Sequence, residues 1–103
     1  MFDFLKSMMG GGNEAAKAAL DNGAVIIDVR TPAEFASGHA DGAVNIPLNT
    51  IGQNINKIKK YNKPVVTCCR SGARSGSAAS VLSGQGIEVH NGGSWQAVQE
   101  MLN

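Results

Sequence analysis

Two adjacent cysteines stand where an apolar run gives way to a short polar loop. The run Val65-Val66-Thr67 is rich in β-branched residues and predicts a buried strand that ends in Cys68 and Cys69. The loop is followed by a helix-compatible segment of small residues, predicted over 75–82 and closed by Gly84. A strand, a tight loop and a helix in this order direct successive backbone N–H groups into a small bowl. Such a bowl at a helix N-terminus favours an anion.

Cys69 is the residue of this stretch best placed for chemistry. It follows the predicted strand directly, and Arg70 and Arg74 lie within five residues of it. Positive charge and backbone N–H groups both stabilise a thiolate, so we expect its thiol to ionise readily. A thiolate that is already formed requires no histidine base. The sequence therefore predicts an activated nucleophile that faces an anion site.

Composition limits the remaining possibilities. The chain has 103 residues, enough for one domain, with 43% hydrophobic and 17% charged residues. The net charge of +1 argues against nucleic acid or an anionic membrane as the main partner. Adjacent cysteines cannot easily form an unstrained disulfide, which favours a reducing, cytoplasmic location. They also lack the spacing of a chelating pair, so neither a metal nor another cofactor is predicted.

The elements that must position Cys69 alternate between strands and helices. An apolar run at 24–29 predicts a parallel strand with Asp28 near its carboxyl end, and Thr31-Pro32-Ala33-Glu34 is a capping box that starts a helix. Further strands are predicted at 43–46 and 86–90, with a turn at Asn91-Gly92-Gly93 before a final helix capped by Ser94. Isoleucines at helical spacing predict a helix between the second and third strands, at Ile51, Ile55 and Ile58. This alternation predicts an α/β fold with a parallel sheet and helices on both faces.

Two regions of different character divide the chain. Residues 1–12 end in three glycines and are predicted to be a flexible segment. Residues 13–103 are predicted to form the single folded domain.

Three motifs along the chain together indicate one protein family. The first is the loop Cys69-Arg70-Ser71-Gly72-Ala73-Arg74-Ser75, which looks like the active-site loop of the rhodanese family of sulfurtransferases. The stretch from Ile27 to Phe35, with the later Gly38-His39 and Gly42-Ala43-Val44-Asn45-Ile46-Pro47, resembles its pattern DVR…E(F/Y)…GH…GA.NIP. The third motif is Gly92-Gly93-Ser94-Trp95, similar to the family's GG…W. The resemblance covers about three quarters of the chain and implies a three-layer α/β/α domain with four to five strands.

The resemblance also implies a reaction. The Cys69 thiolate takes the outer sulfur of thiosulfate or of a persulfide donor, and the resulting persulfide passes it to cyanide or a thiol acceptor. The backbone of the loop would cradle the anionic sulfur, together with Arg70, Ser71, Gly72, Ala73, Arg74 and Ser75. Asp28 or Glu34 is expected to pair with Arg30 and brace the edge of the site. A sulfur-relay protein is a possible partner. Cys68 is interpreted as a small core residue, although sulfur exchange between the two cysteines remains an alternative.

Two other functions are compatible with parts of the pattern. Counted from Cys68, Arg74 has the Cys-x5-Arg spacing of cysteine phosphatases and arsenate reductases, but Thr67 stands where phosphatases usually have histidine. Counted from Cys69, the loop has the shorter sulfurtransferase length. The second alternative is a non-catalytic module that uses this fold to bind proteins, whose members often lack the cysteine.

Overall fold

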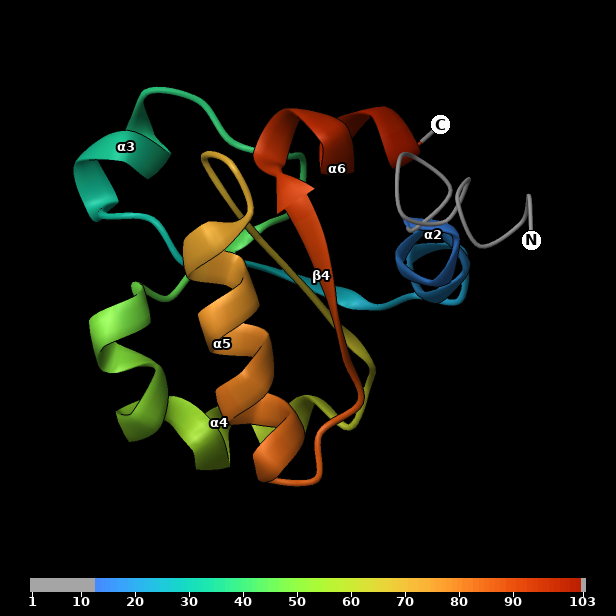
Figure 1. Ribbon diagram of the computed structural model, residues 1–103, viewed down its shortest axis with the longest axis vertical. Coiled ribbons are helices and arrows are strands. Elements are labelled where there is room, and N and C mark those ends of the chain that lie inside the picture. Colours follow the sequence, from blue (N-terminus) through green and yellow to red (C-terminus); the bar gives the residue numbers. More distant parts are fainter. Residues whose placement is uncertain (1–12, 103) are drawn as a thin grey trace.

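Four parallel strands form the centre of the molecule (Figure 1). This computed structural model describes residues 13–102, so the segment 1–12 that was predicted to be flexible lies outside the described residues. In spatial order the strands are β2 (Val44–Asn45), β1 (Val25–Asp28), β3 (Val65–Cys69) and β4 (Val89–Ser94). The predicted parallel sheet is confirmed, and β3 occupies an inner position between β1 and β4. Cys69 therefore ends a strand that is buried along its whole length.

Helices cover both faces of the sheet, which confirms the three-layer α/β/α architecture (Figure 1). The helices are α2 (Glu14–Asp21), α3 (Pro32–Ala36), the 3-10 helix η2 (Leu48–Asn54), α4 (Ile55–Tyr61), α5 (Ala73–Gly84) and α6 (Trp95–Met101). Alanines of α2 and Val98 of α6 pack on one face of the sheet, and residues of η2, α4 and α5 pack on the other. No helix within residues 13–102 is both long and apolar enough to cross a membrane.

Several helix ends follow the sequence signals closely. The Thr31 side chain accepts a hydrogen bond from the Glu34 N–H, and the Glu34 carboxylate accepts one from the Thr31 N–H, which is the predicted capping box. Ser94 caps α6 through the N–H of Ala97. The helix after the cysteine loop begins at Ala73, two residues earlier than expected, because Gly72 adopts φ +103° and supplies its N-cap. The isoleucine periodicity spans two elements, η2 and α4, where a single helix was expected.

The last strand differs most from its prediction. The sequence predicts a strand at 86–90 and a turn at 91–93, but in the structure β4 begins at Val89 and continues through Asn91 and Gly92 to Ser94. Its pairing with β3 runs from Thr67↔Asn91 to Cys69↔Ser94, so two steps on β3 match three on β4 and β4 carries a bulge. In the sequence, the pair Gly92-Gly93 favours a turn, but in the structure it forms this bulge.

The structure requires glycine at positions 92 and 93 for two different reasons. A Cβ atom on Gly92 would lie 2.6 Å from Val98 Cγ2, 2.8 Å from Val66 Cγ1 and 2.9 Å from the Thr67 carbonyl oxygen. Gly93 has free space around it but adopts φ +86°, a conformation that side chains disfavour. The bulge beside Cys69 thus depends on close packing at one position and on backbone conformation at the next.

We expect Gly92→Ala to destabilise the fold by about 1–3 kcal/mol, because the methyl group overpacks the contact between β3, β4 and α6. Gly84→Ala is the matched control, since the space around the last residue of α5 is open and alanine is the better helix former. Urea unfolding of both variants measures the difference. Equal midpoints for the two variants would show that the close approach at Gly92 is not maintained in solution.

Candidate active site

The Cys69 sulfur lies at the point where β3, the cysteine loop and the first turn of α5 meet. The side chain is almost fully buried, at 1% exposure. Its Sγ atom accepts the backbone N–H of Gly72 at 3.0 Å and that of Ser75 at 3.4 Å, and the Ser75 hydroxyl lies 3.4 Å away. The predicted bowl of backbone N–H groups is present, and these groups point at the Cys69 sulfur.

These contacts shift the pKa of the Cys69 thiol downward. Burial acts in the opposite direction and favours the neutral thiol. The Ser75 hydroxyl, when its proton faces the sulfur, and the backbone N–H groups of Ser75, Ser71 and Gly72 act against burial, and the pKa lies below its ordinary value. A larger thiolate fraction makes Cys69 the better nucleophile of the two cysteines.

Cys68 has the opposite environment. Side chains alternate along a strand, so Cys68 faces the layer of α2 and α6 and packs with Val66 and Val98. Burial, followed by the negative charge of Asp28, raises the pKa of the Cys68 thiol to about 12. The interpretation as a core residue is consistent with this placement. Its position on the other face of the sheet argues against sulfur exchange with Cys69 and against Cys68 as a phosphatase nucleophile.

The loop residues divide into exposed and buried groups. Arg70, Ser71 and Ala73 are exposed, whereas Ser75 is fully buried and Gly72 forms the left-handed N-cap of α5. The Ser75 carbonyl accepts a hydrogen bond from the buried Thr67 hydroxyl at 2.9 Å, which ties the start of α5 to β3.

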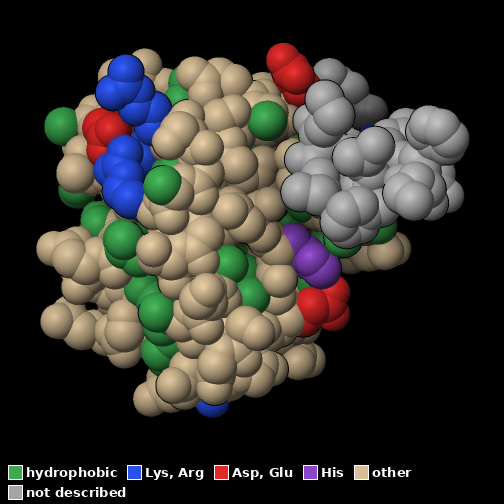
Figure 2. Space-filling view, viewed as in Figure 1, with side chains coloured by type: hydrophobic (Ala, Val, Ile, Leu, Met, Phe, Trp, Pro, Cys, Tyr) green, Lys and Arg blue, Asp and Glu red, His purple; other side chains and the backbone are tan. Residues whose placement is uncertain are grey.

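Arg74 does not point freely into the site. Its guanidinium donates to both carboxylate oxygens of Glu34, at 2.7 and 3.0 Å, across 40 residues of sequence. Basic side chains accordingly gather beside an acidic one near α3 and the start of α5 (Figure 2). The Arg74 hydrogen bond, aided by the Thr31 N–H, lowers the pKa of Glu34 to about 2. Arg70 forms no ion pair with any residue in the described part of the chain.

The expected brace at the edge of the site is formed by Asp28 and Arg30. Both are buried, and the Arg30 Nε and Nη2 atoms donate to the Asp28 carboxylate at 2.9 and 2.7 Å. Arg30 also donates to the backbone carbonyls of Glu34 and Gly38, and its guanidinium lies 5.3 Å from the Trp95 ring centre. The alternative pairing of the Glu34 carboxylate with Arg30 is wrong, because that carboxylate binds Arg74.

Asn91 belongs to the site and was missed in the sequence, where it was interpreted as a turn residue. Its Oδ1 atom accepts the Ser75 hydroxyl at 2.6 Å and the Gly93 N–H at 3.0 Å. Its Nδ2 atom donates to the Gly72 carbonyl at 3.0 Å. One amide thus connects the bulge of β4 with Gly72 in the cysteine loop and with Ser75 in the first turn of α5. No local signal distinguishes this asparagine from one in an ordinary Asn-Gly turn.

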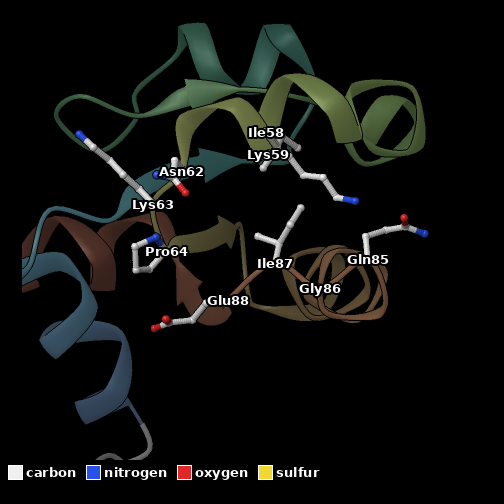
Figure 3. A pocket seen from close by; sticks show the side chains of 9 residues that line it. All are labelled: Ile58, Lys59, Asn62, Lys63, Pro64, Gln85, Gly86, Ile87 and Glu88. Atoms are coloured by element: carbon white, nitrogen blue, oxygen red, sulfur yellow. The ribbon is translucent and has the colours of Figure 1, made fainter.

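A separate hollow lies away from the cysteine. Figure 3 shows this cavity of about 430 Å³ near the starts of β3 and β4, at the opposite end of the strands from Cys69. Its lining contains no cysteine and consists of Ile58, Lys59, Asn62, Lys63, Pro64, Gln85, Gly86, Ile87 and Glu88. Within residues 13–102, no three His, Cys, Asp or Glu side chains converge as a metal site requires.

The fold and the site together define a class of α/β domains in which backbone N–H groups surround a cysteine at the carboxyl end of a parallel strand. The comparison with protein families gives the family within that class. The model of the rhodanese-like domain matches residues 12–100, and the chain belongs to this family.

Relatives and solved structures agree with this assignment. An uncharacterized protein of Bacillus subtilis, YqhL, is 46% identical over 69 residues, which is 66% of this chain but only about half (54%) of that protein. The thiosulfate sulfurtransferase GlpE of Pseudomonas syringae is 40% identical over 72% of this chain and 69% of its own length. A structure described as rhodanese with anions from Escherichia coli has a TM-score of 0.64 and 35% identity, covering 71% of this chain and 88% of that one.

The Glu34–Arg74 pair makes a testable prediction about pH. Because the pKa of Glu34 in the folded protein is about 2, below its ordinary 4.5, the pair stabilises the fold fully above about pH 4.5. That contribution is lost as the pH falls toward 2. Carboxyl NMR titration should place the midpoint of Glu34 near 2 in the native protein and clearly higher in Arg74→Ala, where only the Thr31 hydrogen bonds still lower it. The same midpoint in both proteins would show that Arg74 does not hold Glu34.

Proposed function

We propose that this chain is a sulfurtransferase that carries sulfur as a persulfide on Cys69. The observation that carries the proposal is the pair of N–H groups of Gly72 and Ser75 directed at the Cys69 sulfur. Relatives named thiosulfate sulfurtransferase support it. Thiosulfate or a persulfide is the proposed donor, and cyanide or a thiol is the proposed acceptor.

The first half-reaction loads the cysteine. The Cys69 thiolate attacks the outer sulfur of thiosulfate, a new S–S bond forms, and the S–S bond of thiosulfate breaks. Sulfite leaves with the bonding electron pair, and the terminal sulfur of the persulfide carries the negative charge. The N–H groups of Ser71, Gly72 and Ser75 are directed at the Cys69 sulfur, to which the terminal sulfur is attached. We expect the same loop to donate to the charged terminal sulfur, because preorganised donors stabilise a charge that develops beside them.

The second half-reaction unloads it. A nucleophilic acceptor attacks the terminal sulfur, the persulfide S–S bond breaks, and the Cys69 thiolate returns. Cyanide leaves as thiocyanate, and a thiol acceptor leaves as its own persulfide. No proton has to be supplied to the leaving sulfur, because its pKa is already lowered by the bowl. Two successive covalent half-reactions predict ping-pong kinetics.

The surrounding residues have separate roles in this proposal. The backbone from Arg70 to Ser75 is the anion cradle, and the exposed Arg70 is the cation available to a negatively charged donor. Arg74 is committed to Glu34 and holds α3 against the loop. Asp28, the last residue of β1, and Arg30, two residues further on, form a buried ion pair that supports the edge of the site.

We expect thiosulfate to add the mass of one sulfur atom to the reduced protein, and cyanide to remove it. Cys69→Ser should abolish the gain, because it removes the nucleophile. Cys68→Ser should retain it, since Cys68 faces the opposite layer. Intact-mass spectrometry of the three proteins measures the result. A gain that persists in Cys69→Ser and disappears in Cys68→Ser would refute the assignment.

Arg70→Ala should raise the KM for thiosulfate about tenfold to one hundredfold, because one charge-assisted contact to the donor is lost. Arg70→Lys keeps the charge and should recover most of the affinity. Initial rates at varied thiosulfate with saturating cyanide separate KM from kcat. An unchanged KM in Arg70→Ala would place donor recognition entirely on the backbone N–H groups.

A further inference from the structure

The Ser75 hydroxyl lies between two groups that compete for its single proton. Its Oγ atom is 2.6 Å from Asn91 Oδ1 and 3.4 Å from Cys69 Sγ. A hydroxyl donates one hydrogen bond only. If the proton points to one of these two atoms, the Ser75 oxygen turns a lone pair toward the other.

The orientation of the Asn91 amide is fixed by its neighbours. The Gly72 carbonyl can only accept, so the amide nitrogen faces it at 3.0 Å. The Gly93 N–H can only donate, so the amide oxygen faces it at 3.0 Å. These two backbone groups exclude the flipped amide, and the oxygen that Ser75 meets is an acceptor.

With its proton on Asn91, Ser75 turns a lone pair toward Cys69. A neutral Cys69 thiol fits this arrangement, because the S–H group can donate to Ser75 Oγ. A Cys69 thiolate does not, because two lone pairs then face each other across 3.4 Å. The thiolate gains the hydroxyl hydrogen bond only when Ser75 turns its proton away from Asn91.

We propose that Asn91 is a positioning residue that acts on Cys69 through Ser75, by holding the hydroxyl proton away from the thiolate. Its significance for sulfur transfer rests on the proposed function, in which the Cys69 thiolate is the nucleophile. In the persulfide the Cys69 Sγ atom is no longer anionic, and the hydroxyl returns to Asn91. Asn91 therefore favours the loaded cysteine over the free thiolate, and a smaller fraction of Cys69 is ionised at a given pH than if the hydroxyl proton faced the sulfur.

The charged groups near Cys69 are separate from this contact. Arg70 lies in the loop, Arg74 of α5 is paired with Glu34 of α3, and Arg30 is paired with Asp28 of β1. Neither Asn91 nor Ser75 forms a hydrogen bond with any of these side chains. Substitution of Asn91 by an uncharged residue therefore leaves the charges around the sulfur in place.

The test is a titration of Cys69 without any sulfur donor, by thiolate absorbance and by the rate of iodoacetamide alkylation localised to Cys69 by peptide mass. Cys68 does not interfere, because burial and Asp28 raise its pKa to about 12. Asn91→Leu has a similar shape and no acceptor, and position 91 is exposed. We expect it to lower the Cys69 pKa by about one unit, the worth of one hydrogen bond to a charged group.

Two further variants distinguish this role from a general loosening of the loop. In a Ser75→Ala background, Asn91→Leu should no longer move the Cys69 pKa, because the connecting hydroxyl is gone. Asn91→Asp retains the acceptor and adds negative charge, so the pKa should rise. Asn91→Ala replaces Asn91→Leu if the larger side chain prevents folding.

An unchanged or raised Cys69 pKa in Asn91→Leu overturns the proposal, and so does a shift of equal size in the Ser75→Ala background. Because the titration needs no sulfur transfer, failure of the proposed reaction and failure of this inference give different results. The first appears as a missing sulfur adduct in the native protein, and the second as an unaltered titration curve.

Discussion

The alternation of side chains at the end of β3 determines the chemistry of the two cysteines. Consecutive residues of a strand face opposite sides of a sheet, so Cys68 and Cys69 cannot share one environment. Cys68 is paired in register with Asp28 and is enclosed by the α2 and α6 layer, where ionisation is opposed. Cys69 faces the first turn of α5, whose N–H groups favour ionisation. A shift of one residue in this register would exchange the two roles.

The bulge in β4 connects the Cys69 environment at the end of β3 with the neighbouring strand. An extra residue between the partners of Thr67 and Cys69 lets β4 stay paired while Asn91 reaches the turn before α5. The bulge can lie close against β3 only because Gly92 has no side chain. The space beside Gly92 is too small even for a Cβ atom. The close packing at Gly92 and the hydrogen bonds of Asn91 therefore depend on the same backbone geometry of the β4 bulge.

The sequence was sufficient for the parallel strands, the capping box of α3 and the loop around Cys69, because each has a local signature. It was insufficient for Asn91, since an asparagine before two glycines carries the same local signal in a turn and in a bulge. The pairing of Glu34 with Arg74 was also missed. Which carboxylate meets which guanidinium depends on how the 40 residues between the partners fold, and Arg30 was an equally reasonable partner.

The distribution of charge favours a particular kind of ligand. The arginines near Cys69 suggest a strongly cationic pocket, but Arg30 and Arg74 are neutralised by Asp28 and Glu34. What remains for an incoming anion is the exposed Arg70 and a set of N–H groups that converge on one sulfur atom. Under the proposed function, this arrangement fits a single anionic sulfur attached to Cys69 better than the several oxygens of a phosphoryl group, which need donors spread around them. The two ion pairs at the edge of the site thus leave fewer unpaired cations near Cys69.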